Sequence, residues 1–336
     1  MQQRTQTHPS VRINTAYISH GGGPLPLLEM QSEGEARTPA YHIEMIEALK
    51  ALSTDLPKPD AVIVISAHWE DTEVCVTTHP EPSLIYDYYG FPKEAYSLEY
   101  PAKGEVALAT LLLKRLAEQG IAVREDRARG FDHGMFIPLS IMYPSADVPC
   151  IQLSITSDLD SKKHVLLGEA IRKAVELGVE PVNSEAKNEV NILVLGSGSS
   201  FHNMQGFFDS SDDAMRKATR FNNWLQTTMQ TSAYGENERK ARLVEWYSAP
   251  DARYAHPREE HLLPLHVCYG VNNRAADKAM SLTLLTKPAS MFVWCDCGRQ
   301  HRGHLFVSES NFKLFQSLFI FCLRTWFQNR VCQNLS

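Results

Sequence analysis

The run INTAYIS at residues 13–19 leads directly into HGGGP at 20–24, and the run AVIVISA at 61–67 leads in the same way into HWE. Both runs are short, rich in β-branched residues and apolar on both faces, as expected of strands in a sheet that helices cover on each side. Three further runs share this character, at residues 74–78, 150–155 and 191–195. The repetition predicts five strands of an α/β layer fold.

Longer amphipathic segments separate these runs. Their apolar residues recur at spacings of three and four, which is typical of helices that bury one face. The predicted helices cover residues 41–52, 104–119, 161–177, 212–231 and 259–269. Because the alternation of strands and helices extends from residue 13 to about 294, we expect a single domain over 13–294, preceded by a flexible N-terminus at 1–12.

Two segments depart from this alternation. Residues 180–190, EPVNSEAKNEV, are polar and predict a surface insertion before the fifth strand. The atypical C-terminal tail, residues 295–336, runs from CDCGRQHRGH into the apolar and aromatic NFKLFQSLFIFCLRTWF. Two interpretations of the tail stay open: a docked terminal helix, or sequence that does not fold with the rest.

The charge balance argues against several kinds of partner. The chain has 33 Lys and Arg against 39 Asp and Glu, a net charge of -6, and no basic cluster interleaved with aromatics, so nucleic acid is not expected. It has no apolar run of about 18 residues, and MQQRTQTHPS lacks the apolar core of a signal peptide. We therefore expect a soluble, cytoplasmic protein without membrane contact; the composition leaves the oligomeric state open.

Three histidines follow three of the predicted strands. His20 lies after the first strand in YISHGGGP, His68 after the second in VISAHWE, and His202 after the fifth in LVLGSGSSFHN. Ligands of open α/β sheets bind at the carboxyl ends of the strands, so these imidazoles are expected to converge on one crevice. The glycines beside them allow the close backbone approach that a crowded site requires.

A fourth histidine, His133, lies in RGFDHGMFIPL, a segment that we expect to be non-helical. The preceding Asp132 has two possible roles there, orienting the imidazole or capping the following turn. The segment by itself does not choose between them.

The segment AHPREEHLLPL holds further candidate ligands. Pro257 suits the first position of a helix, which places Glu259, Glu260 and His261 in an opening helical turn with His256 just outside it. One of these side chains is expected to reach a metal, although local spacing does not say which. Neutral imidazoles with at most one carboxylate suit Zn(II) or Fe(II) better than the oxygen-seeking Ca²⁺ or Mg²⁺.

A long aromatic loop follows the third strand, at residues 80–100. Prolines break it into irregular structure, and two roles for its aromatic side chains stay open: lining a pocket for a flat ligand, or anchoring the loop. The aromatic side chains concerned are Tyr86, Tyr88, Tyr89, Phe91 and Tyr96.

Six motifs now stand in order along residues 13–294: SHGGGP, SAHWE, YYGFP, GFDHGMFIPL, GSGSSFHN and HPREEHLLPL. Together they resemble those of the class III extradiol ring-cleavage dioxygenases, in particular the 4,5-DOPA dioxygenase-like branch. The resemblance implies a three-layer α/β/α sandwich around a mixed, mostly parallel central sheet. It also implies a mononuclear non-haem metal, which is Fe(II) in active dioxygenases and zinc in some members.

The resemblance also assigns roles to single residues. His20, His68 and His261 match the metal ligands. His202 matches a histidine near the metal that serves acid–base chemistry and is sometimes counted as a ligand, and His133 matches a pocket histidine that contacts the substrate. Gly23 lengthens the usual loop after His20, and the family pattern ends near residue 294, so the tail has no counterpart.

The implied activity is insertion of O2 into a catechol, of DOPA type, to give a muconic semialdehyde. An alternative keeps the fold but makes the chain a zinc-binding metallohydrolase or a non-oxygenase zinc protein, since Zn(II) has no redox chemistry. A serine hydrolase is disfavoured: the run HGGG resembles an oxyanion-hole segment, but no G-x-S-x-G elbow occurs. The expected partners are a small aromatic catechol and O2, and the sequence does not name the catechol.

Overall fold

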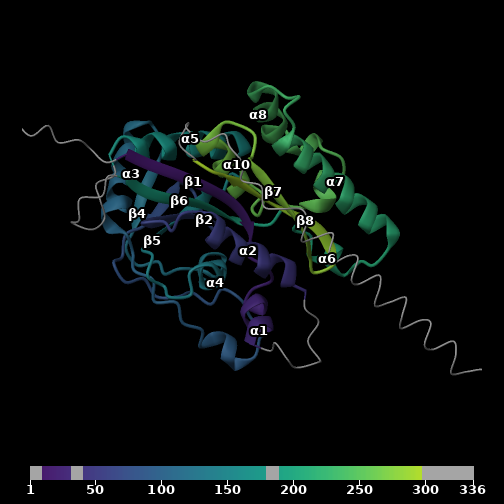
Figure 1. The fold of residues 1–336 in the computed structure, drawn as a ribbon, viewed down its shortest axis with the longest axis horizontal. Coiled ribbons are helices and arrows are strands. Elements are labelled where there is room, and N and C mark those ends of the chain that lie inside the picture. The colour runs from purple at the N-terminus through teal and green to yellow at the C-terminus, as the bar shows by residue number, and fades with distance from the viewer. Residues whose placement is uncertain (1–9, 32–40, 179–188, 297–336) are drawn as a thin grey trace, which may run out of the picture. The chain divides into compact units, whose positions relative to one another are not determined.

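One mixed sheet of eight strands lies at the centre of the computed structural model, which describes residues 10–31, 41–178 and 189–296 (Figure 1). In space the strands follow the order β4-β3-β5-β2-β6-β1-β8-β7. Their bounds are β1 Ser10–Ser19, β2 Ala61–Asp71, β3 Val74–Thr77, β4 Val123–Asp126, β5 Cys150–Thr156, β6 Glu189–Gly198, β7 Lys278–Leu284 and β8 Lys287–Trp294.

Parallel pairs form the centre of the sheet. Strand β6 pairs in parallel with both β1 and β2, β2 pairs in parallel with β5, and β3 pairs in parallel with β4. The antiparallel pairs are β3 with β5, β1 with β8, and β7 with β8. The expectation of a mixed, mostly parallel sheet is therefore confirmed.

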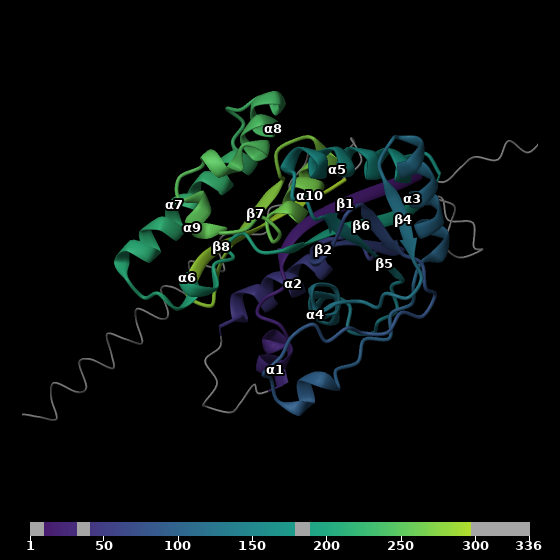
Figure 2. The ribbon, with the colours of Figure 1, turned by 180° about the vertical axis from the view of Figure 1, so that it is seen from behind.

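Helices cover both faces of this sheet. Alternate residues of β2 belong to different cores: Val62 and Val64 pack with α2 and α4, whereas Ile63 and Ile65 pack with α3, α5 and α10. Figures 1 and 2 show these two sets of helices on opposite sides of the strands. The helices are α1 Leu25–Gln31, α2 Ile43–Asp55, α3 Val106–Glu118, α4 His133–Met142, α5 Ser161–Glu176, α6 Met204–Phe208, α7 Asp212–Gln230, α8 Glu236–Val244, α9 Ala252–Ala255 and α10 Leu263–Asn272. The result is the expected three-layer α/β/α sandwich.

The structure corrects two helix predictions. Helix α4 begins at His133, where we expected no helix; its sequence is apolar on every side and contains Pro138, so it lacks amphipathic spacing. Helix α10 begins at Leu263, and Glu259–His261 lie in turns before it rather than in a first helical turn. The first-turn proline is Pro264, not Pro257.

Three of the five predicted strands extend a few residues beyond their expected ends, and three strands were not predicted: β4, β7 and β8. Residues 189 and 190, assigned to a polar insertion, begin β6. The rest of that segment, the N-terminal residues 1–9 and the tail from 297 to 336 lie outside the described residues. Among the helices of the described ranges, none combines the length and apolarity that crossing a membrane requires.

Candidate active site

Three histidines from distant parts of the chain meet at one end of the sheet. His20 directly follows β1, His68 lies in β2, and His261 precedes α10. One nitrogen of each imidazole lies within 4.8 Å of the others, and the Nε2 atoms of His20 and His68 are 3.1 Å apart. His20 and His261 are buried and His68 is partly exposed. The predicted convergence of His20 and His68 is therefore observed, and His261, which only the family resemblance placed with them, completes the cluster.

Hydrogen bonds determine which nitrogen of His20 carries the proton. The hydroxyl of Ser197 donates to the carbonyl of Gly134, and its oxygen lies 2.9 Å from Nδ1 of His20. Since the single hydroxyl proton is already used, the serine oxygen accepts from the Nδ1–H of His20. The lone pair of His20 is thus on Nε2, the atom that faces His68.

Asp87 orients two imidazoles. Its Oδ1 accepts hydrogen bonds from the backbone N–H of His133 at 3.0 Å and from Nδ1 of the same residue at 2.8 Å. Its Oδ2 lies 3.5 Å from Nδ1 of His68. Both rings therefore direct Nδ1 toward the carboxylate and leave Nε2 for other partners.

Glu260 serves another pair of imidazoles in the same way. Its Oε1 lies 3.0 Å from Nδ1 of His261 and 3.1 Å from Nδ1 of His202. The two rings stack, with centroids 3.4 Å apart and planes inclined by 14°. Asp87 and Glu260 thus divide four histidines between them. Each contacts one member of the cluster His20, His68 and His261, and each contacts one histidine outside it, either His133 or His202.

The backbone of His261 is fixed by its surroundings. Its carbonyl oxygen accepts hydrogen bonds from the hydroxyl of Tyr17 at 2.8 Å and from the amide of Ser199 at 3.0 Å. A Cβ atom at Gly198 would lie 2.1 Å from this same oxygen. Only glycine at the end of β6 permits so close an approach.

Burial keeps the clustered imidazoles neutral. It is the main cause that lowers the pKa of His20 and His68 well below the ordinary value, and the neighbouring imidazoles lower both further. Burial and the nearby His202 lower the pKa of His261 to about 3. Neutral imidazoles are the form that ligates a metal.

The two carboxylates remain charged. Burial raises the pKa of Glu260, but hydrogen bonds from His202 and His261 outweigh it and hold the pKa well below its usual range. At Asp87, burial likewise raises the pKa, and the hydrogen bond from His133 outweighs it, so this pKa is also lowered. The site therefore combines neutral imidazoles with two anionic acceptors.

The donor set fits a borderline metal ion. Two Nε2 lone pairs that face each other at 3.1 Å repel unless a cation lies between them. Nitrogens bound tetrahedrally at about 2.0–2.1 Å from a metal are roughly 3.3 Å apart, which is close to the observed distance. Three neutral nitrogens suit Zn(II) or Fe(II).

A cavity of about 480 Å³ opens beside these histidines. All five of them line it, together with the glycines at 21–23 and side chains of the aromatic loop. Both roles considered for that loop are observed: Tyr89 and Phe91 line the cavity, whereas Tyr86 donates its hydroxyl proton to the carbonyl of Leu98 at 2.7 Å. Tyr88 does both, because its hydroxyl bonds to the carbonyl of Ala95.

Several expected placements differ in detail. His68 lies within β2, at an irregularity in its pairing with β5, rather than after the strand. Asp132 occupies the N-cap position of α4, but its side chain makes no capping hydrogen bond and does not orient His133. Its buried carboxylate bonds to Ser66, Arg129 and Gln152 instead. His256 bonds through Nε2 to the carbonyl of Ser200 and does not join the cluster.

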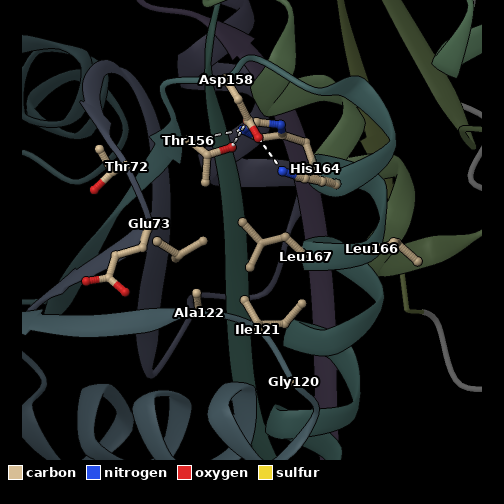
Figure 3. A pocket seen from close by; sticks show the side chains of 12 residues that line it. Thr72, Glu73, Gly120, Ile121, Ala122, Thr156, Asp158, His164, Leu166 and Leu167 are labelled. Carbon is tan, nitrogen blue, oxygen red and sulfur yellow. Dashed lines mark hydrogen bonds and ion pairs between the residues drawn. The ribbon is translucent and has the colours of Figure 1, made fainter.

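A second cavity, of about 300 Å³, lies elsewhere in the fold (Figure 3). Thr156, Asp158 and His164 gather at one end of it, and apolar side chains such as Leu167 line the rest together with Thr72 and Glu73. Its polar groups pair with one another: Asp158 accepts from Thr156 and Lys163, and both nitrogens of His164 bond to backbone. Of these two cavities, the one beside the histidines holds the reactive groups.

Sequence reasoning missed the role of Asp87 and left that of Glu260 open. Asp87 stands between Tyr86 and Tyr88 in the aromatic loop, where no local pattern marks it as a partner of His133, 46 positions further on. Glu260 belonged to the candidate segment, and its adjacency to His261 was the available signal.

The chain is similar in sequence to known ring-opening dioxygenases. A family model described as the catalytic LigB subunit of aromatic ring-opening dioxygenase matches residues 14–292. A 4,5-DOPA dioxygenase extradiol of Beta vulgaris is 38% identical over 215 residues, which are 63% of this chain and 73% of that protein. The dioxygenase tasH of Hapsidospora irregularis is 33% identical over 266 residues, 75% of this chain and 76% of its own.

Comparison of sequences and of structures also finds similarity in Escherichia coli K12. A 4,5-DOPA dioxygenase extradiol of Escherichia coli is 32% identical over 257 residues, covering 76% of this chain and 84% of its own. The crystal structure of an uncharacterized protein from Escherichia coli K12 superimposes with a TM-score of 0.61 at 25% identity. That superposition covers 84% of this chain and 99% of the other.

Proposed function

The chain belongs to the family of the catalytic LigB subunit of aromatic ring-opening dioxygenases, and we propose that it cleaves a catechol ring outside the two hydroxyls. Both atoms of O2 enter the product, a muconic semialdehyde. The observation that carries the proposal is the set of five imidazoles around one cavity, three converging through single nitrogens and two held beside them by carboxylates. The domain at 13–294 carries this activity.

We assign the metal to His20, His68 and His261. Hydrogen bonds or carboxylate contacts at Nδ1 leave Nε2 of each ring available as a ligand. Family members use a non-haem metal, and we propose Fe(II), because reaction with O2 needs a redox-active ion. A metal held by these three residues would supply a binding site for the diol and for O2 and a route for electron density from the ring to O2.

His202 is the proposed general base. Glu260 holds the Nδ1–H of His202, so the nitrogen that remains to accept a proton from the catechol is Nε2. The imidazolium formed would be stabilised by the charged carboxylate of Glu260, and its Nε2–H would later return the proton as a general acid. His202 is partly exposed at the cavity wall, where a substrate hydroxyl can reach it.

His133 is the proposed substrate-binding histidine. Asp87 fixes both its backbone amide and its Nδ1–H, so the ring cannot rotate. Its Nε2 then presents one fixed hydrogen-bonding atom to the bound catechol. Because Glu260 positions His202 and Asp87 positions His133, proton transfer and substrate binding are assigned to two independently held histidines.

The proposal is tested by loading the metal-free protein with Fe(II) or Zn(II) without oxygen and then adding a catechol in air. We expect oxygen uptake and the yellow absorbance of a ring-opened semialdehyde with Fe(II) alone. His20→Ala and His68→Ala should each abolish stoichiometric metal binding, measured directly by metal analysis. Tight Zn(II) binding with no oxygen uptake for any catechol would instead favour the metallohydrolase or zinc-protein alternative.

A further inference from the structure

The cavity beside the histidines is polar only at its base. Among the described residues that line it, the ionisable groups are the five histidines, Asp87 and the phenols of Tyr88 and Tyr89, and no Lys or Arg is present. Asp87 is already engaged, since its two oxygens face His133 and His68. A substrate carboxylate would therefore meet no cationic side chain among these described lining residues, and it would lie next to a fixed negative charge.

The mouth of the same cavity is apolar. Three large side chains line the cavity and yet are mostly exposed: Tyr89 at 92%, Phe208 at 78% and Met204 at 60%. Two of them belong to the short helix α6 and the third to the aromatic loop. Behind them, Phe207 and Leu284 continue the apolar wall in buried positions. Large apolar side chains left in water around a pocket are typical of a ligand-binding surface.

The volume exceeds what a catechol ring requires. A cavity of about 480 Å³ lies within the range of about 300–1,000 Å³ that holds drug-sized ligands. With the diol at the histidines, the side chains that bound the remaining space include Phe207, Phe208 and Met204. A substituent on the ring would therefore contact these apolar side chains.

We propose that the substrate is a catechol whose ring bears an uncharged, apolar substituent that packs against Tyr89, Met204 and Phe208 at the cavity mouth. The inference rests on the proposed function and specifies its substrate class. It differs from DOPA, whose substituent carries an ammonium and a carboxylate. Burial against these side chains stabilises a bound apolar chain. A carboxylate at the same place would lose its hydrating water and find no cationic side chain to replace it.

Binding to the zinc-loaded full-length chain tests this without requiring turnover. Calorimetry compares 4-butylcatechol with 3-(3,4-dihydroxyphenyl)propionate, which have substituents of similar length. We expect a Kd at least about tenfold lower for 4-butylcatechol, because only its chain is stabilised by the apolar mouth. An equal or lower Kd for the carboxylate would overturn the inference.

A variant locates the effect. Phe208→Ser should raise the Kd of 4-butylcatechol about fivefold and leave that of unsubstituted catechol within about twofold, since only the substituent reaches this side chain. Tyr247→Ser is the matched control, because Tyr247 is 57% exposed and does not line the cavity. Equal effects of the two variants on 4-butylcatechol would contradict the assigned position.

The outcomes separate this inference from the proposed function. If the Fe(II)-loaded chain opens both catechols but prefers the carboxylate, the function stands and the substrate class is wrong. If neither catechol binds the zinc-loaded chain at millimolar concentration and the Fe(II)-loaded chain opens neither, both fail.

Discussion

Replacing Glu260 by Gln removes one negative charge from beneath two imidazoles and leaves the side chain nearly the same shape. In the wild-type protein Oε1 lies 3.0 Å from Nδ1 of His261 and 3.1 Å from Nδ1 of His202. Hydrogen bonds to a charged acceptor exceed neutral ones by about 1 kcal/mol, so the two together lose about 2 kcal/mol. That energy corresponds to roughly a thirtyfold change in an equilibrium constant.

This loss of hydrogen-bond energy should lower both zinc affinity and turnover. Zinc affinity, measured by competition with a chelator, is expected to fall because His261 is less firmly oriented, and turnover of the Fe(II)-loaded enzyme is expected to fall because His202 loses its counter-charge. A combined decrease of 10- to 100-fold is usual for residues that orient metal ligands. Both quantities should be measured on the same preparations, so that metal loss is not mistaken for slow chemistry.

Glu259→Gln is the matched control. The carboxylate of Glu259 pairs with Arg253 and does not line the cavity, so its neutralisation should leave both quantities within about twofold. If Glu260→Gln behaved like Glu259→Gln, the shared carboxylate would not position the two imidazoles and the reasoning would be refuted.

Three further predictions concern Gly198 and Asp87 at the site and His266, a buried histidine of α10. Gly198→Ala places a Cβ atom 2.1 Å from the carbonyl oxygen of His261 and should lower zinc affinity more than tenfold, whereas Gly235→Ala, in open space, should not; equal affinities would contradict the packing. Asp87→Asn should raise KM for catechol and lower kcat in steady-state oxygen uptake, and unchanged values would remove Asp87 from the site. Burial lowers the pKa of His266 from 6.5 to about 4, so below about pH 6.5 only the unfolded chain takes up this proton. Chemical denaturation from pH 7.5 to pH 5 should therefore show about 2 kcal/mol less acid destabilisation in His266→Gln than in the wild type, and equal losses would contradict it.

The centre of the fold was predictable from the sequence because its strands are buried on both faces. Strands β1, β2, β5 and β6 carry apolar residues on both sides, which leaves a strong local signal. The three strands that were not predicted include both edges of the sheet. β4, VRED, is short and half exposed, and β7 alternates with polar residues, so neither has the continuous apolar run that was sought.

The histidines of the site were also predictable, since the order of the motifs indicated all five and the predicted strand ends indicated His20, His68 and His202. The role of their partner Asp87 was not predictable, because Asp87 and His133 are distant in sequence and meet only in the folded chain. Asp87 reaches His133 only because the loop at 80–100 folds back, paired at Leu84 with Phe131. Helix α4 was missed for a related reason: a helix buried on all sides has no polar face to mark its period.

Cleavage of the ring with both atoms of O2 is the central claim, and labelled oxygen tests it directly. The Fe(II)-loaded chain is given 4-butylcatechol under ¹⁸O₂, and the product is examined by mass spectrometry, with the His20→Ala variant as control. We predict a ring-opened product, absent from the variant, with one labelled atom retained in the new carboxylate and a second in the aldehyde until that oxygen exchanges with water. An unopened ring, or a product without label from O2, would contradict it.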